Sequence, residues 1–309
     1  MITGILPHAI FILLLLGIGT DAESAGQNQP EITKIYVSVP PLAYFAERIG
    51  GSRFDIKTVI GPGQSPATHE TTPKQFAEFS KADIFFTAGV PFEEHLNKKL
   101  KSTFENLNIV DTQKGIKLQH LEFRHYHGDA GDETNKETNE KSEKNSLDPH
   151  TWLDPSLAKI MAQNIYDGLI EIFPSDSLLY KKNLNMLLED LDRIDSFIKQ
   201  ELKPYVDRRF YTFHPAFGYF AKAYNLKQIA IEFEGKEPSA RQLTEIIKKA
   251  KEDNVEIIFT QPQFSDKTAR AIAESVGARV IPIDPLSKDY LNSLKEITRQ
   301  LVLAFEGVQ

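Results

Sequence analysis

Residues 176–204 read DSLLYKKNLNMLLEDLDRIDSFIKQELKP. In this stretch the apolar side chains recur at steps of three and four residues, as they do along one face of an α-helix. The recurring residues are Tyr180, Leu184, Leu187, Leu188, Leu191, Ile194, Ile198 and Leu202. A helix over residues 176–202 would be about 40 Å long. Pro174 and Pro204 would delimit it, because proline disrupts helical hydrogen bonding. The pattern predicts a long, stiff helix that connects two parts of the chain.

Short β-rich segments alternate with helical patterns on both sides of this helix. The strand candidates are Ile35–Val39, Lys57–Ile60, Ile84–Thr87, Ile109–Asp111, Phe210–Phe213, Gln228–Ile231, Glu256–Thr260 and Arg279–Ile283. The helix candidates are Leu42–Ile49, Lys74–Ser80, Ser239–Asp253 and Asp266–Val276, with Ser239 and Ser265 as N-caps of the last two.

This alternation is typical of parallel sheets covered by helices. We therefore predict an α/β fold with two lobes, each with a roughly four-stranded parallel sheet flanked by helices. The predicted N-terminal lobe covers residues 31–175, the linking helix 176–203 and the C-terminal lobe 204–309.

The composition excludes several classes of function. The 309 residues carry a formal net charge of −7, with 41% hydrophobic and 26% charged residues, which is ordinary for a folded protein. No cluster of lysine or arginine stands out, so we expect no nucleic-acid partner. The chain has no cysteine, which rules out disulfides, thiolate metal sites and a lipid-modified cysteine.

The N-terminal residues suggest export. Ile10–Ile18 reads IFILLLLGI, which is too short to span a bilayer but fits the apolar core of a signal peptide. Small residues follow, and cleavage after Ala22 or Ser24 would suit them. An uncleaved anchor is the alternative. We predict a cleaved signal peptide over residues 1–25 and a periplasmic protein.

Residues 120–146 form a second unusual segment. They contain acidic, basic, Asn and Gly residues with almost nothing to bury, which predicts a solvated loop. His120, His125 and His127 lie in it. They could capture metal loosely, or the loop could be an insertion without such a role.

Three other histidines and one aspartate could bind a metal. His69, His150 and His214 lie in Pro-rich or Gly-rich turns, and Asp284 directly follows a predicted strand. Ligand sites of α/β sheets occupy the loops beyond the carboxyl ends of strands. Three imidazoles and a carboxylate suit zinc, although for any one of these residues alone the stronger interpretation is a histidine that caps a backbone group or an aspartate that opens a turn.

Several motifs resemble the zinc/manganese solute-binding proteins of bacterial ABC importers. They are DPHTWLDP at 148–155, HPAFGYF at 214–220, IEFEGKEPSA at 231–240 and IDPL at 283–286. The resemblance extends from about residue 34 to the C-terminus. It implies two lobes joined by one long helix, with metal held between them by His150 from one side and by His214 and Asp284 from the other. It also implies delivery to a membrane permease subunit and a monomeric protein.

The first ligand motif departs from that family. The family has Pro-Gly-x-Asp-Pro-His, whereas Pro62–Ala67 reads PGQSPA, so that Ala67 takes the place of the histidine. His69 lies two residues further and would point to the same side of an extended segment. We predict His69 as the ligand, with Glu70 and a water as the substitutes.

Imidazole at position 214 favours Zn²⁺ as the transported ligand, because manganese prefers oxygen donors. In the resembling family, manganese binders tend to carry a carboxylate there. The alternative within the same family is a manganese- or iron-binding relative, with Mn²⁺ as the transported ligand.

Two other classes of protein remain possible from the residues. His69–Pro73 begins like the His-Glu-x-x-His motif of zinc hydrolases, but Pro73 replaces the second histidine. No other catalytic motif accompanies it, and we predict that the protein is not an enzyme. A surface adhesin is the third reading, and the absence of an anchor cysteine disfavours it.

Overall fold

A computed structural model describes residue 1 and residues 33–121, 147–232 and 236–307. Residues 2–25 of the predicted signal peptide and residues 122–146 of the predicted charged loop, with His125 and His127, lie outside the described residues. No helix among the described residues is both long enough and apolar enough to cross a membrane.

The first sheet is parallel and has the strand order β2-β1-β3-β4. Its strands are β1 (Thr33–Val37), β2 (Phe54–Thr58), β3 (Ile84–Thr87) and β4 (Asn108–Asp111). All of the predicted strands are present, but β2 begins three residues earlier than predicted. The apolar Val59 and Ile60 suggested a later strand; they are buried just beyond the end of β2, where their N–H groups donate to Val37 and Ser38.

The second sheet repeats this order, β6-β5-β7-β8, and is also parallel. Its strands are β5 (Arg209–Thr212), β6 (Lys227–Ala230), β7 (Ile257–Thr260) and β8 (Arg279–Pro282). The predicted α/β class with two four-stranded parallel sheets is confirmed.

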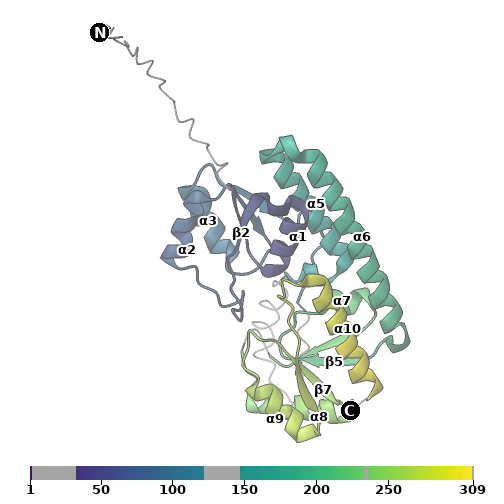
Figure 1. Ribbon diagram of the computed structural model, residues 1–309. Coiled ribbons are helices and arrows are strands. Elements are labelled where there is room, and N and C mark those ends of the chain that lie inside the picture. Colours follow the sequence, from purple (N-terminus) through teal and green to yellow (C-terminus); the bar gives the residue numbers. More distant parts are fainter. Residues whose placement is uncertain (2–32, 122–146, 233–235, 308–309) are drawn as a thin grey trace. The chain divides into compact units, whose positions relative to one another are not determined.

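Helices connect and cover the strands (Figure 1). They are α1 (Pro40–Gly50), α2 (Pro73–Glu78), α3 (Glu93–Thr103), α5 (Pro155–Ile172), α6 (Ser177–Leu202), α7 (Gly218–Ala223), α8 (Ala240–Glu252), α9 (Lys267–Val276) and α10 (Tyr290–Glu306). Short 3-10 helices are η1 (Gly51–Arg53), η2 (Phe79–Lys81), η4 (Thr151–Leu153), η5 (Pro174–Asp176) and η6 (Lys203–Tyr205).

The N-cap predictions had different outcomes. Ser239 caps α8 as predicted, because its hydroxyl accepts from the backbone N–H of Gln242 and the Gln242 side chain accepts from the N–H of Ser239. Ser265 is not the N-cap of α9. Asp266 takes that position without a side-chain cap, because α9 begins one residue later than the sequence pattern suggested.

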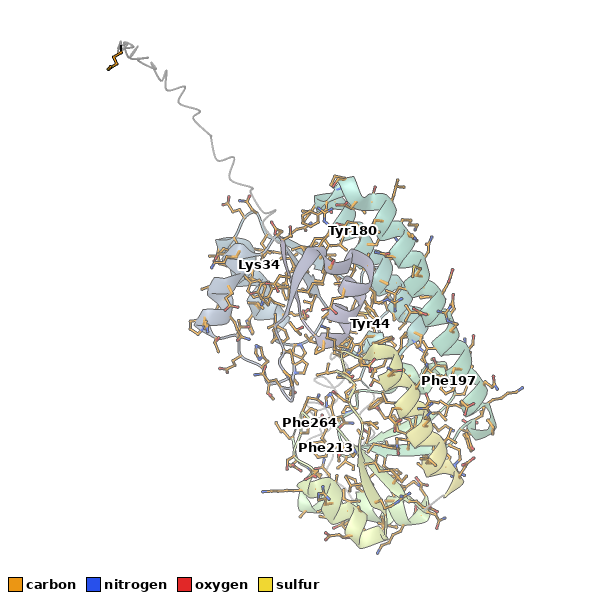
Figure 2. All side chains as sticks on the ribbon, viewed as in Figure 1. Lys34, Tyr44, Tyr180, Phe197, Phe213 and Phe264 are labelled. Atoms are coloured by element: carbon orange, nitrogen blue, oxygen red, sulfur yellow. The ribbon has the colours of Figure 1, made fainter. Side chains whose placement is uncertain are left out.

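Helix α6 confirms the prediction for residues 176–202, with 26 residues and a continuous buried face. It packs against α5 and α1 on the side of the first sheet and against α10, which follows the second sheet. Figure 2 shows Tyr180 and Phe197 toward its two ends. Apolar residues of both sheets and of α6 form one core, and a smaller core lies between the second sheet and α8 and α9. The predicted domain boundaries stay predictions.

The common strand order makes positions in the two sheets equivalent. Val37 pairs with Thr58 and Phe86, and Thr212 pairs with Ala230 and Phe259 in the same way. Counting on from these pairs, and from the outer pairs Thr87–Asp111 and Thr260–Pro282, gives the equivalent residues at the carboxyl ends. They are Val39 and His214, Ile60 and Glu232, and Gln113 and Asp284.

Candidate metal centre

His214 lies two residues beyond the end of β5. The connection after β5 leads to β6 on one side, and the connection after β7 leads to β8 on the other side, so the two connections diverge between β5 and β7. Loops at such a point are the usual ligand site of an open parallel sheet. The backbone N–H of His214 donates to Oε1 of Gln261, 2.9 Å away, just beyond β7. The Gln261 amide in turn donates to the Thr212 hydroxyl. This link between two central strands fixes the backbone that carries the imidazole.

The His214 ring is held on two sides. Its Nδ1 lies 2.6 Å from Oε1 of Glu232, whose side chain is only 2% exposed. Its face stacks on Phe264, with ring centroids 4.7 Å apart, and Phe264 lies beside Phe213 (Figure 2). Burial lowers the pKa of His214 below its ordinary value, while the hydrogen bond to Glu232 acts in the opposite direction. A neutral imidazole, as a metal ligand must be, is therefore favoured at neutral pH.

His150 has a matching arrangement in the turn that precedes η4. Its Nδ1 lies 2.7 Å from Oδ1 of Asp148, and the same oxygen accepts from its backbone N–H at 3.0 Å. The Asp148 side chain is 2% exposed. Trp152 presents itself edge-on to the His150 ring, with centroids 5.3 Å apart.

The two anchored histidines meet each other. Their Nε2 atoms are 3.4 Å apart, although 64 residues separate them in the chain. A carboxylate accepts a hydrogen bond from each Nδ1–H, so in the neutral rings both Nε2 atoms carry lone pairs and cannot donate to each other. Two nitrogens on a tetrahedral zinc ion, each with a bond of about 2.0–2.1 Å, would be about 3.3 Å apart. The observed separation fits two imidazoles that share one ion.

Hydrogen bonds tie the His150 turn to both halves of the chain. From the first sheet, the Gln113 amide donates to the carbonyl of Pro149 and to the Thr151 hydroxyl, both at 2.9 Å. From the second, the carbonyl of Pro285 accepts from Trp152 Nε1 at 2.8 Å. The Tyr290 hydroxyl donates to the carbonyl of Trp152 at 2.5 Å. The buried Trp152 thus links the His150 turn to the turn that contains Asp284.

Asp284 directly follows the second sheet, two residues beyond β8. Its Oδ1 accepts from Gln263 Nε2 at 2.8 Å and from the N–H of Leu286 at 3.0 Å. No described hydrogen bond uses its Oδ2. The carboxylate is half-buried and could supply an oxygen ligand.

His69 lies in the loop between β2 and α2. Its ring packs edge-on against Phe92, with centroids 5.1 Å apart. Its Nε2 is buried without a hydrogen-bond partner among the described residues, and burial lowers the pKa of this imidazole. Ala67 and Glu70 are both exposed. An unpartnered, neutral ring nitrogen is a competent metal ligand.

The structure brings His150 and His214 together, but not all of the predicted ligands. Within residues 33–121, 147–232 and 236–307, no group of three or more His, Asp or Glu side chains is placed to hold a metal ion. His69 and Asp284 therefore remain predicted ligands. His120 forms an antiparallel bridge with Leu147 at the base of the segment 122–146.

Asp148 and Glu232 lie in two of the sequence motifs, but no role was predicted for either of them. Each has a signal that could have found it. Glu232 directly follows the predicted strand Gln228–Ile231. Asp148 precedes His150 by two residues, the spacing at which an aspartate side chain accepts from a backbone N–H further along the chain. No local signal marks Phe264, because its contact with His214 depends on packing.

A family model described as the zinc-uptake complex component A, periplasmic, matches residues 35–304. The chain is 28% identical over 306 residues to the high-affinity zinc uptake system protein ZnuA of Bacillus subtilis (strain 168), covering 96% of this chain and 90% of that protein. A crystal structure of ZnuA matches with a TM-score of 0.79 at 36% identity, covering 89% of this chain and 99% of that chain.

A structure of a ZnuA deletion mutant with zinc bound matches with a TM-score of 0.78 at 35% identity, covering 89% of this chain and 98% of that chain. The family model spans most of the chain. This protein belongs to the family of the periplasmic component A of zinc-uptake complexes.

Proposed function

We propose that this protein binds Zn²⁺ outside the cytoplasm and delivers it to the membrane permease subunit of an ABC importer. The observation that carries the proposal is the pair of Nε2 atoms, 3.4 Å apart, with each Nδ1 held by a buried carboxylate. The names of the similar proteins agree with zinc as the cargo.

The donor set favours zinc over manganese. The candidate site has two imidazoles in contact, and imidazole suits zinc whereas carboxylate and carbonyl oxygens suit manganese. Phe264, stacked on the His214 ring, and Trp152, in a T-shaped contact with the His150 ring, make the surroundings apolar. We therefore expect Mn²⁺ to compete poorly with Zn²⁺.

His69 and Asp284 are proposed to complete the coordination. Each has a polar atom without a described hydrogen bond, Nε2 in His69 and Oδ2 in Asp284. His69 approaches from the loop after β2, and Asp284 from the turn after β8. Movement of the two segments on metal binding would supply the third and fourth ligands that a closed zinc site uses.

A zinc titration of the demetallated protein against a chromophoric chelator tests the proposal. The parent is compared with His150→Ala, His214→Ala, His69→Ala and Asp284→Ala, with Mn²⁺ as the competing ion. We expect tight one-to-one binding in the parent and its loss in the first two variants. Absence of tight zinc binding in the parent would overturn the proposal.

The last two variants define the rest of the site. A large loss of affinity in His69→Ala would establish that this histidine replaces the ligand missing at Ala67. Unchanged affinity in His69→Ala with a loss in Asp284→Ala would leave one coordination position to water.

Catalysis is not part of the proposal. Glu70, the general base that a hydrolase would require beside His69, is exposed and has no described hydrogen bond to His69. We expect the zinc-loaded protein to leave a panel of ester and peptide substrates intact. Export by a cleaved signal peptide and a monomeric state are further proposals, which N-terminal sequencing of the exported protein and sedimentation would test.

A further inference from the structure

His150 belongs by sequence to the first half of the chain, but a residue of the second half holds its turn. The hydroxyl of Tyr219, on α7, donates to the backbone carbonyl of Asp148 at 3.1 Å and accepts from the N–H of Gln119 at 3.0 Å. Asp148 is the residue whose carboxylate accepts from the His150 ring and from its backbone N–H. Tyr219 therefore contacts the support of His150 and not His150 itself.

Gly218, the residue before Tyr219, lies directly against the carboxylate of Asp148. A Cβ atom at Gly218 would lie 2.7 Å from Oδ2 of Asp148 and 2.9 Å from Nε2 of Gln119. Both distances are shorter than real contacts allow, so only glycine lets α7 approach the Asp148 side chain this closely. Gly218 and Tyr219 together form a seat for Asp148.

The seat is continuous with the second histidine. His214 precedes Gly218 by four residues, and backbone bonds from Ala216 to His214 and from Ala221 to Phe217 make the segment a compact turn. Phe217 and Phe220 are fully buried and fix the segment on the core. One short stretch of chain thus carries one histidine and supports the other.

We infer that Gly218 and Tyr219 are positioning residues that set the separation of the two Nε2 atoms by seating Asp148. The inference rests on the proposed zinc function. It explains how the Nε2 atoms come to lie 3.4 Å apart although the two histidines follow different sheets, because the segment 214–219 carries His214 and also holds the residue that supports His150.

The test uses Tyr219→Phe in the full chain, which removes the hydroxyl and keeps the buried ring. Supporting groups of metal-bound histidines typically contribute 10–100-fold to affinity, and Tyr219 acts one contact further out, so we expect zinc affinity to fall about 10-fold. Gly218→Ala displaces Asp148 directly, and we expect a loss of about 10–100-fold.

Tyr224→Phe is the matched control. Tyr224 follows the last residue of α7, is 4% exposed like Tyr219, and its hydroxyl donates to Asp195 on α6 at 3.1 Å, away from the histidines. This variant loses one buried tyrosine hydroxyl at the same helix, and we expect its zinc affinity to equal that of the parent. Thermal unfolding of Tyr219→Phe and Tyr224→Phe reports any general destabilisation.

A double-mutant cycle separates positioning from a general structural role. If Tyr219 acts through Asp148, Tyr219→Phe lowers affinity in the parent but adds nothing in an Asp148→Ala background. Additive losses in the double variant would overturn the inference, as would equal zinc affinities of Tyr219→Phe and the parent.

A second readout needs no zinc. In the metal-free protein, the ¹⁵N resonances of the His150 ring report which nitrogen carries the proton. We expect Tyr219→Phe to shift the His150 resonances and to leave those of His214 unchanged. If the parent failed to bind zinc, the proposed function would be wrong, but this readout would still test whether Tyr219 positions Asp148. Unshifted His150 resonances would contradict the positioning role alone.

Discussion

The two sheets have the same strand order, yet they differ at equivalent positions of their carboxyl ends. The second sheet presents His214, Glu232 and Asp284, whereas the first presents Val39, Ile60 and Gln113. Val39 and Ile60 are fully or almost fully buried and belong to the apolar core. The backbone scaffold is therefore shared, and only the side chains turn one copy into a candidate metal site.

The first sheet contributes to the site by a different route. Its Gln113 supports the His150 turn, which comes from a segment beyond β4 and not from a strand end. The loop after β3 is closed by Glu93, whose carboxylate accepts from the N–H groups of Ala88 and Gly89 at 2.8 Å. In the second sheet a neutral amide, that of Gln261 just beyond β7, instead links the backbone of His214 to the Thr212 hydroxyl. The repeated fold therefore fixes the positions at which a ligand residue can lie, but it does not fix which of the two sheets carries such a residue.

The largest expected effect comes from making the second sheet resemble the first. His214→Val installs the residue found at the equivalent position 39 and removes one of the two paired imidazoles. We expect zinc affinity to fall by more than 100-fold, beyond the 10–100-fold that supporting groups contribute. Chelator competition measures it, and a parent-like affinity would contradict the assignment of the site to the second sheet.

Replacing the carboxylate that supports His214 should have the next largest effect. Glu232→Gln removes the charge that holds Nδ1, so we expect zinc affinity to fall about 10–100-fold with the fold retained. Asp148→Asn should behave alike, because its contact with His150 is equivalent. Glu274→Gln, an exposed carboxylate on α9, serves as the control and should leave affinity unchanged.

The charged closure of the first sheet should make stability depend on pH. Burial raises the pKa of Glu93 from its ordinary value of 4.5 to about 7, against the hydrogen bonds to its carboxylate. Between these values the folded state binds more protons than the unfolded state, so the free energy of unfolding falls as pH rises through this window.

The variant Glu93→Gln carries a neutral amide, as the second sheet does at Gln261, and should lack this slope. We expect the parent to lose about 1–3 kcal/mol more than Glu93→Gln between pH 4.5 and pH 7. Denaturant unfolding at several pH values measures the difference. Parallel pH profiles of the two proteins would show that Glu93 does not titrate in this window.

The smallest effect concerns the equivalent helices that lead into β3 and β7. Thr72 with Gln75 caps α2, and Ser239 with Gln242 caps α8, both through reciprocal side-chain and backbone bonds. Thr72→Ala and Ser239→Ala should each lower the free energy of unfolding by about 1 kcal/mol. Unequal losses in denaturant unfolding would show that the repeat does not extend to helix capping.

The amino-acid sequence was enough to predict the α/β class, the presence of the strands, and α6 with its buried face. Those features depend on local periodicity, because the side chains on one face of a strand or helix recur at fixed steps along the chain. It also marked His150 and His214, since each lies in a distinctive run of residues. The late start assigned to β2 and the cap assigned to Ser265 were wrong, because segment ends depend on tertiary hydrogen bonds.

The contacts that hold the two histidines in place depend on the tertiary fold. The 3.4 Å between their Nε2 atoms, the burial of Asp148 and Glu232 behind them, and the contact of Tyr219 with Asp148 all join segments far apart in the chain. No periodicity encodes such distances, because they follow from the way that the two sheets and α6 share one packed core.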